Sequence, residues 1–298
     1  MSLTEVEQLT VAGIINGSAY ALLGVSFALV LGVTGRFHYA FALVYTVAAY
    51  VTSVLISGAG VPYPLAMLAA PVAAAALGVA IERIVYRPLA AASGVLSLLT
   101  IFIAALGITI AGVNGITLIW SSQSRAIDAF SVKPLHVGTV TFTTLELALV
   151  LVAWALVGAV AWMLAKTDLG RSIKAVRGNL DLARTIGLRP NSIYLVVFAL
   201  SSVLCAVAAI FGGMRFAVQP DMGTRPVVFA FVVAFLGGTR SSPLVIGLAG
   251  LFLGLVESLS GVWVSPQWAS LVVFSVLFAY LTLRPVDLRA LRVLLTRG

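Results

Sequence analysis

The chain has 298 residues, of which 61% are apolar and only 9% are charged. Ordinary soluble domains carry roughly 25% charged residues, so a soluble domain of this size could not hide so much apolar surface. A disordered chain is excluded as well, because disorder requires low hydrophobicity. The sequence therefore predicts a protein whose main solvent is lipid. Spans of about 20 residues each would use most of the apolar residues and leave little for a domain outside the membrane.

Nine apolar runs follow one another along the chain, and none shows the strict alternation that is typical of barrel strands. We therefore expect helices, which satisfy the backbone in lipid. The predicted fold is all-α: one polytopic transmembrane helical domain, residues 1–298, with about 8–9 membrane segments. The run 226–239 is short and ends in two glycines, so it is either a tilted helix or a re-entrant element. The runs are 9–32, 37–57, 62–82, 94–119, 144–165, 193–214, 226–239, 243–262 and 267–283.

The distribution of basic residues predicts an orientation. The N-terminus is acidic and lacks the positive segment of a signal peptide, so the first run is expected to be a retained span. If the N-terminus lies outside and all nine runs cross, fourteen Lys and Arg residues lie inside and four lie outside. Lys and Arg are enriched in cytoplasmic loops, so we expect the N-terminus outside and the C-terminus in the cytoplasm. The same bias explains the net charge of +8 without a nucleic-acid partner. The inner residues are Arg36, Arg83, Arg87, Lys166, Arg171, Lys174, Arg177, Arg184, Arg189, Arg240, Arg284, Arg289, Arg292 and Arg297; the outer ones are Arg125, Lys133, Arg215 and Arg225.

The sequence carries no signature of an enzyme. Its two histidines, His38 and His136, are far apart and have no carboxylate near them in the sequence. No His or Cys residues have the spacing of metal ligands, and the absence of any Gly-Lys dipeptide excludes a P-loop. The single cysteine, Cys205, lies in an apolar run and is expected to be inert packing. We expect no metal and no cofactor in this chain, and any ATP would be hydrolysed by another subunit.

Acidic residues within apolar runs are candidates for function. Glu257 lies in the eighth run, where it could contact a substrate or a partner helix, or lie near the outer interface bonded to Ser258 or Ser260. Glu82 is followed directly by Arg83, and we expect a surface pair at a helix end. These few acids do not form the chain of intramembrane carboxylates that a proton relay needs.

Two pairs of glycines are spaced four residues apart, Gly13 with Gly17 and Gly250 with Gly254. Small residues at this spacing let helix backbones approach closely. The pairs predict dense helix packing, either within this subunit or at an interface with a partner subunit.

The longest inner loop, about residues 166–192, carries six basic and two acidic residues. Apolar residues recur in it every three or four positions, as the amphipathic pattern of a short helix or helix pair requires. Such an element lies in the headgroup region or docks into a groove on a cytoplasmic partner, and the sequence leaves both open. The outer counterpart is the loop of about 120–143. The apolar positions are Ile173, Val176, Leu180, Ala183 and Ile186.

This loop resembles the coupling segment of ATP-binding-cassette importer permeases. Residues 181–187, Asp-Leu-Ala-Arg-Thr-Ile-Gly, are similar to the loose pattern Glu-Ala-Ala-x-x-x-Gly. Residues 167–171 followed by 183–188 look like the branched-chain amino acid permease family, of the LivH and LivM type, and the basic loop after the third run looks LivH-like. The resemblance covers nearly the whole chain in the right order. Its other segments are 16–22, 32–35, 82–89, 234–238 and 242–243.

The resemblance implies a permease subunit in a bacterial inner membrane that translocates its solute by alternating access. The solute would be a branched-chain or hydrophobic amino acid, or a related small carboxylate or amide. The implied partners are a second permease subunit of the LivM type, two cytoplasmic ATPases that bind ATP and Mg, and a periplasmic or lipid-anchored substrate-binding protein. The implied substrate path holds Asn16, Tyr20, His38, Tyr39, Phe41, Tyr45, Phe229 and Glu257. The implied ATPase coupling residues are Gly170, Arg171, Asp181, Ala183, Arg184 and Gly187.

Some positions depart from the family pattern. After Thr34-Gly35 the family typically has Asn-Phe-Ala-His-Gly-Glu, where this chain has residues 38–43, His-Tyr-Ala-Phe-Ala-Leu. Phe229 stands where a lysine is usual, and Arg240 where a glycine is usual. The path is therefore expected to be more apolar and more aromatic. One rival class is a secondary transporter driven by an ion gradient, which needs intramembrane acids or broken helices. A second is a membrane protein with a structural or assembly role and no transport activity.

Overall fold

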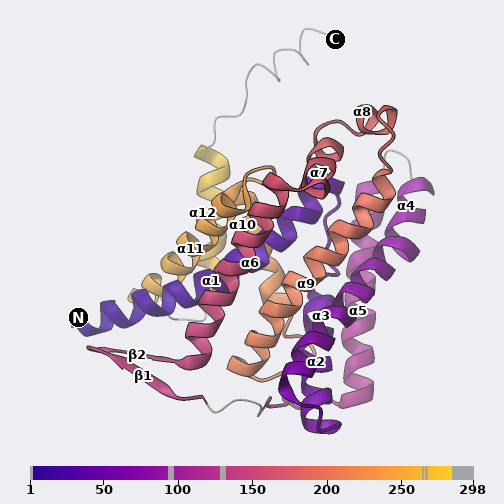
Figure 1. Ribbon diagram of the computed structural model, residues 1–298. Helices are drawn as coiled ribbons and strands as arrows, with labels where there is room; N and C mark the ends of the chain where they lie inside the picture. Colours follow the sequence, from indigo (N-terminus) through magenta and orange to yellow (C-terminus); the bar gives the residue numbers. More distant parts are fainter. Residues whose placement is uncertain (1–2, 93–96, 128–131, 264, 266–267, 284–298) are drawn as a thin grey trace.

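The computed structural model describes residues 3–92, 97–127, 132–263, 265 and 268–283, and in this part the chain is a bundle of helices with one small hairpin (Figure 1). Two of the helices, α2 and α3, continue into a short π-helical segment. The elements in order are α1 Leu3–Thr34, α2 Phe41–Ser53, the π-helix η1 Val54–Gly58, α3 Tyr63–Ala80, the π-helix η2 Ile81–Tyr86, α4 Arg87–Ala92, α5 Ser97–Trp120, β1 Pro134–Val137, β2 Val140–Thr143, α6 Thr144–Lys166, α7 Asp168–Gly178, α8 Leu180–Thr185, α9 Pro190–Phe216, α10 Thr224–Gly237, α11 Pro243–Ser260 and α12 Ala269–Leu283.

Among the described residues, seven helical segments are long and apolar enough to cross a membrane. Two shorter apolar helices accompany them, Thr224–Gly237 and Leu271–Tyr280. The predicted class, an all-α polytopic membrane protein, is confirmed, and the predicted eight or nine segments approximate this count. The run 226–239 forms α10, a helix of 14 residues. Whether α10 crosses the membrane or re-enters it stays a prediction.

Parts of the sequence predictions fall outside the described residues. Four of the basic residues counted for the orientation, Arg284, Arg289, Arg292 and Arg297, are among them. The same holds for residues 128–131 of the outer loop, 94–96 of the fourth run and 267 of the ninth.

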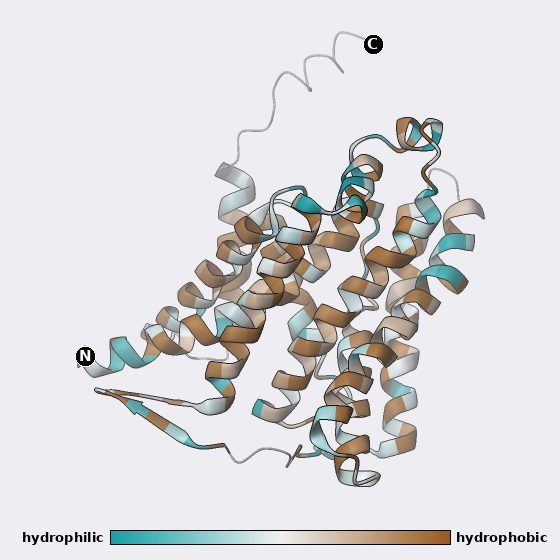
Figure 2. Cartoon of the chain, viewed as in Figure 1, coloured by the Kyte–Doolittle hydropathy of each residue, from teal (hydrophilic) through white to brown (hydrophobic). Residues whose placement is uncertain are grey.

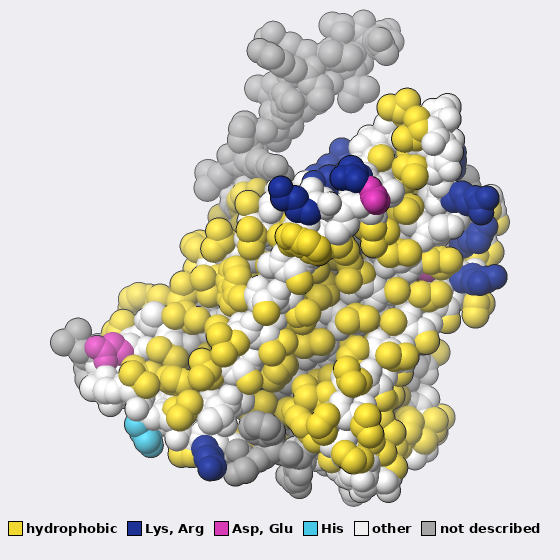
Figure 3. All heavy atoms as spheres, in the orientation of Figure 1, with side chains coloured by type: hydrophobic (Ala, Val, Ile, Leu, Met, Phe, Trp, Pro, Cys, Tyr) yellow, Lys and Arg dark blue, Asp and Glu magenta, His cyan; other side chains and the backbone are white. Residues whose placement is uncertain are grey.

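The two ends of the bundle differ in their polar residues. The start of α1 and the β1–β2 hairpin lie at one end, and α7 and α8 lie at the other (Figure 1). Hydrophobic residues dominate the helices between the two ends (Figure 2). On the face drawn in Figure 3, most Lys and Arg side chains gather at the end that carries α7 and α8. This separation of charge supports the predicted orientation, which stays a prediction.

The helices α1 and α11 approach so closely that their glycines form the contact. A Cβ atom at Gly17 would lie 2.8 Å from the Cα atom of Leu251, and one at Gly250 would lie 2.5 Å from the backbone nitrogen of Ala21. A Cβ at Gly254 would overlap the backbone of Gly17. The glycine spacing therefore serves packing within this chain, which was one of the two alternatives.

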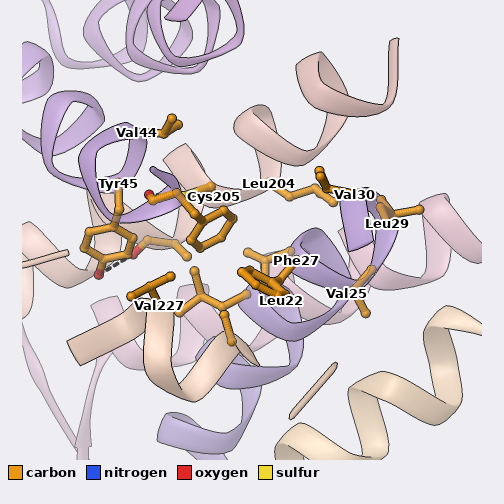
Figure 4. Close-up of a cluster of buried hydrophobic side chains, with 14 of the residues drawn as sticks. Leu22, Val25, Phe27, Leu29, Val30, Val44, Tyr45, Leu204, Cys205 and Val227 are labelled. Atoms are coloured by element: carbon orange, nitrogen blue, oxygen red, sulfur yellow. Dashed lines mark hydrogen bonds between the residues drawn. The ribbon is translucent and has the colours of Figure 1, made fainter. Parts of the chain in front are cut away.

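The core lies where α1 meets α2, α9 and α10. Leu22 and Phe27 of α1 face Leu204 and Cys205 of α9, with Tyr45 of α2 beside them (Figure 4). Cys205 has no exposed surface, in agreement with the expected packing role. The centre of the bundle is therefore built by α1, which contacts most of the helices that wall the cavities described below.

The close contact of α1 with α11 predicts that a glycine-to-alanine substitution lowers stability at this contact but not at an open position of another helix. Gly250→Ala inserts a methyl group against rigid backbone and should destabilise the fold by about 1–3 kcal/mol. The matched control Gly107→Ala has no atom within 4 Å of the new Cβ, so it should leave stability unchanged or slightly raised. Thermal unfolding midpoints of the two variants in detergent test this. Equal midpoints would contradict the packing described for α11.

Candidate functional site

A cavity of about 600 Å³ lies towards the hairpin end of the bundle. Residues of α1, α2, α9, α10 and α11 line it, together with the connection between α9 and α10. Pockets of about 300–1,000 Å³ are typical of small-molecule sites. We refer to this cavity as the outer pocket.

Glu257 is the buried acid of the outer pocket, with 8% of its surface exposed. Its carboxylate accepts a hydrogen bond of 2.6 Å from the Tyr20 hydroxyl and one of 3.1 Å from Nη2 of Arg225. Ser260 donates to the main-chain carbonyl of Glu257 and not to its carboxylate. The partners of this acid therefore come from α1 and α10, and they bring three helices together at one carboxylate.

A second pair of charges lies at the other side of the outer pocket. Nη1 of Arg215 donates to Oδ1 of Asn16 at 2.9 Å, and Nη2 lies 3.0 Å from a carboxylate oxygen of Glu146. The side chain of Arg215 is 19% exposed, whereas that of Arg225 is 63% exposed. The pocket thus presents one well-buried and one accessible guanidinium.

Aromatic rings form the apolar wall of the outer pocket. The rings of Tyr20 and Phe229 stack with their centroids 4.4 Å apart, and the Arg225 guanidinium lies 5.5 Å from the Phe229 centroid. Phe229 holds the position where the sequence pattern suggests a lysine, so the cation of this wall comes from Arg225 one turn earlier. A solute with charges of both signs and an apolar side chain finds a partner for each part.

Five of the eight predicted path residues line the outer pocket: Asn16, Tyr20, Tyr45, Phe229 and Glu257. The other three do not line it and lie where the chain passes from α1 into α2. There His38 is 2% exposed and lies 2.9 Å from the Tyr86 hydroxyl. The Tyr39 carbonyl accepts a hydrogen bond of 3.5 Å from Thr109, and the Phe41 ring lies 5.8 Å from that of Phe27.

Two arginines of the outer pocket, Arg215 and Arg225, were absent from the predicted path. The sequence placed them in outer loops, where they counted only towards orientation. One signal could have found them: oppositely charged residues at the outer ends of neighbouring runs, as in Arg225 and Glu257, can meet across a pocket.

The expected surface pair of Glu82 and Arg83 is wrong. Glu82 is 1% exposed and pairs with Arg36 across the bundle, whereas Arg83 is exposed. Consecutive residues on a helix point in different directions, so neighbours in sequence do not face each other. The Tyr194 ring covers Arg36, with its centroid 5.2 Å from the guanidinium carbon. This buried pair ties the start of the α1–α2 connection to η2.

The predicted amphipathic loop is a pair of helices, α7 and α8, each with its own cap. Thr167 Oγ1 accepts a hydrogen bond from the Gly170 amide at 3.1 Å. Asn179 Oδ1 accepts from the amides of Asp181 and Leu182, each at 3.0 Å. Side-chain oxygens at these positions stabilise helix starts. Of the five predicted apolar positions, Ile173, Val176 and Ala183 are buried, Leu180 is partly buried and Ile186 is exposed.

The six predicted coupling residues divide between the inside and the outside of this helix pair. Gly170 and Ala183 face inward: a Cβ at Gly170 would lie 2.5 Å from the Cα of Leu164, and Ala183 is 1% exposed. Gly187 ends the segment with a φ of 85°, a conformation that glycine adopts without strain. The exposed members form two pairs, Arg171 with Asp168 and Arg184 with Asp181.

The exposed face of α8 and the residue that follows it carry two large apolar side chains that the predicted coupling set did not include. Leu182 is 61% and Ile186 is 65% exposed. They lie at the basic end of the bundle, beyond the membrane-spanning helices. We refer to them as the α8 patch.

The fold and the outer pocket define a class: a polytopic helical membrane permease. The chain belongs to the family described as "Branched-chain amino acid transport system / permease component", which matches residues 9–281. A transport role makes the chain a permease subunit and not an enzyme.

Relatives agree over the whole length. The chain is 29% identical to the high-affinity branched-chain amino acid transport system permease protein BraD of Pseudomonas aeruginosa, with 94% of each chain covered. It is 27% identical to LivH of Escherichia coli K12, with 93% of this chain and 92% of that protein covered.

A solved structure, PsaBC from Streptococcus pneumoniae in complex with Fab, shares the fold with a TM-score of 0.54. The match covers 94% of this chain and 91% of that one at 14% identity. At this identity the likeness shows the fold alone.

The buried Arg36–Glu82 pair predicts a response to loss of charge. Glu82→Gln leaves the Arg36 charge buried without a counter-charge, which costs about 3–5 kcal/mol. Replacing both residues by Gln should recover part of this loss. The control Asp168→Asn breaks an exposed pair with Arg171 and should leave stability unchanged, because exposed pairs contribute little. Thermal midpoints of the purified variants measure all three effects, and a wild-type midpoint for Glu82→Gln would contradict the buried pair.

Proposed function

We propose that the chain is the membrane permease subunit of an ATP-binding-cassette importer that carries a branched-chain or similar hydrophobic amino acid across the bacterial inner membrane. The observation that carries the proposal is the family match over residues 9–281, in a chain whose outer pocket presents paired charges beside aromatic rings. The names of BraD and LivH support the same substrate class.

The outer pocket suits a zwitterion with an apolar side chain. Arg225 is the accessible guanidinium. Guanidinium groups can bind a carboxylate through two parallel N–H donors. Glu257 is the buried carboxylate that the ammonium group of the solute would approach. The ammonium group would then replace Arg225 as a hydrogen-bond donor to this carboxylate. The stacked rings of Tyr20 and Phe229 supply the apolar wall. The lining holds two arginines, Arg215 and Arg225, and two acids, Asp221 and Glu257, so its positive and negative charges balance, which suits a zwitterion better than a free carboxylate.

The coupling half of the proposal rests on α7 and α8. These helices join α6 to α9, so a force applied to them reaches two membrane helices directly. The α8 patch, together with Arg184 and Gly187, would dock on a cytoplasmic ATPase, while Gly170 and Ala183 hold the helix pair against the bundle. ATP binding would close the ATPase dimer, and the permease would then alternate between outward-open and inward-open states.

The proposed assembly also contains a second permease of the LivM type, two ATPase subunits that bind ATP and Mg, and a substrate-binding protein that is periplasmic or lipid-anchored. In the proposed orientation the N-terminus lies outside, and the outer pocket would face the binding protein. His38, Tyr39 and Phe41 would contact the solute only after it leaves this pocket. Uptake driven by ATP inside proteoliposomes of the full assembly tests the function; uptake by this chain alone with an ion gradient would favour a secondary transporter.

For the substrate site, we expect Glu257→Gln to weaken uptake while Tyr20 keeps a neutral bond to residue 257. A charge-assisted hydrogen bond contributes about 1.5–3 kcal/mol, so the apparent affinity should fall about ten- to hundredfold. The measurement is the concentration dependence of radiolabelled leucine uptake. Glu7→Gln, at the exposed start of α1, is the matched control. Unchanged leucine affinity in Glu257→Gln would remove this acid from the path.

For the coupling surface, an aspartate at Leu182 or Ile186 should disrupt ATPase docking. Burying one such side chain stabilises a contact by about 1.5–3 kcal/mol, so affinity should fall about ten- to hundredfold. The measurement is the amount of ATPase that co-purifies with the tagged permease. Val137→Asp is the matched control, because Val137 is an exposed apolar residue, 64% accessible, on the hairpin at the opposite end. Wild-type co-purification of Leu182→Asp and Ile186→Asp would exclude the α8 patch.

A further inference from the structure

A second cavity, of about 500 Å³, lies at the other end of the bundle from the outer pocket. It is open to its surroundings and is lined by the end of α1, the junction of α7 and α8, the start of α9 and the turn after α10. We refer to it as the inner cavity. Its position beside α7 and α8 places it between the proposed coupling helices and the membrane bundle.

The inner cavity contains positive charge without negative charge. Arg177 and Arg240 line it, and no Asp or Glu is among the described residues that line it. The ion pairs of the described residues, counted to 4.0 Å, include neither arginine. A third arginine, Arg36, lies nearby against Tyr194, but Glu82 already neutralises it. Both arginines of the outer pocket, in contrast, have an acidic partner.

The two arginines are close enough to affect each other. Burial, and after it the positive charge of Arg240, lower the pKa of the Arg177 guanidinium. Arg177 is partly buried and Arg240 is exposed, and like charges near each other repel. An anion between the two guanidinium groups would replace this repulsion with two attractions.

The remaining wall of the inner cavity suits an oxyanion on a larger molecule. Tyr194 contributes a ring and a hydroxyl, and Leu31 and Phe235 contribute apolar surface below the arginines. Guanidinium groups bind phosphate and carboxylate oxygens through paired N–H donors. Basic pockets between transmembrane helices on the cytoplasmic side are also known to hold lipid headgroups.

We infer that the inner cavity is a binding site for an oxyanion, a phosphate or carboxylate group, which Arg177 and Arg240 hold together. The anion comes either from a phospholipid headgroup or from a soluble ion. The assignment of the inner cavity to the cytoplasmic side of the membrane rests on the proposed function, whereas the anion site itself does not. A bound anion would join α7 to the turn after α10. Because α10 also walls the outer pocket, occupancy would tie the coupling helices to the helix that carries Arg225.

Protection of arginine from phenylglyoxal, followed by mass spectrometry, tests the site. The complete transporter is placed in vesicles of phosphatidylcholine alone, in the same vesicles with inorganic phosphate, or in vesicles with added phosphatidylglycerol. At a probe concentration ten times its Kd, modification of Arg177 and Arg240 should slow about tenfold. Arg83, exposed at the same end, is the internal control. Protection by phosphatidylglycerol alone identifies a headgroup, and protection by phosphate alone identifies a soluble ion.

A variant shows whether both arginines hold one anion. In Arg240→Gln, protection of Arg177 should fall at least severalfold, whereas in Arg83→Gln it should persist. Equal modification rates in all three vesicle conditions overturn the inference, as does equal slowing of Arg83. Full protection of Arg177 in Arg240→Gln overturns the shared site. These measurements do not depend on transport. If uptake failed while the anion still protected the arginines, the proposed function would be refuted and the anion site would be retained.

Discussion

The contact between α1 and α11 is the constraint on which the outer pocket depends. Glycines on both helices let the backbones touch, and this contact sets the distance between Tyr20 and Glu257. Side chains at Gly17 or Gly254 would push the helices apart and separate the phenol from the carboxylate. In a membrane, where helix association depends on close packing, such glycines determine which polar groups can meet.

The helices α1 and α10 form walls of both cavities. Their outer halves contribute Tyr20 and Phe229 to one, and their inner ends contribute residues to the other. Between these positions, the rings of Phe27 and Phe231 lie 6.4 Å apart and pack with Phe37. The two cavities are therefore separated by an aromatic layer on the same two helices. A shift of α10 against α1 would therefore change the walls of both cavities together.

Charges have different roles at different depths of this protein. The Arg36–Glu82 pair is buried and holds the α1–α2 connection against η2. The pairs of the outer pocket are partly accessible. The exposed pairs on α7 and α8 lie at the surface, where water screens them and they contribute little to stability.

The sequence by itself determined the class of fold, because continuous apolar runs leave the backbone no solution in lipid other than helices. Local apolar spacing also predicted three buried positions of α7 and α8, Ile173, Val176 and Ala183, but not the exposure of Ile186. Tyr20 was named as a predicted path residue from the family resemblance, and Glu257 also as an acid within an apolar run. Their contact could not be predicted, because 237 residues separate them. Only the tertiary structure decided that Glu82 turns to Arg36 and that Arg225 reaches Glu257. Such partners follow from helix rotation and crossing, which a linear pattern of apolar and charged residues does not specify.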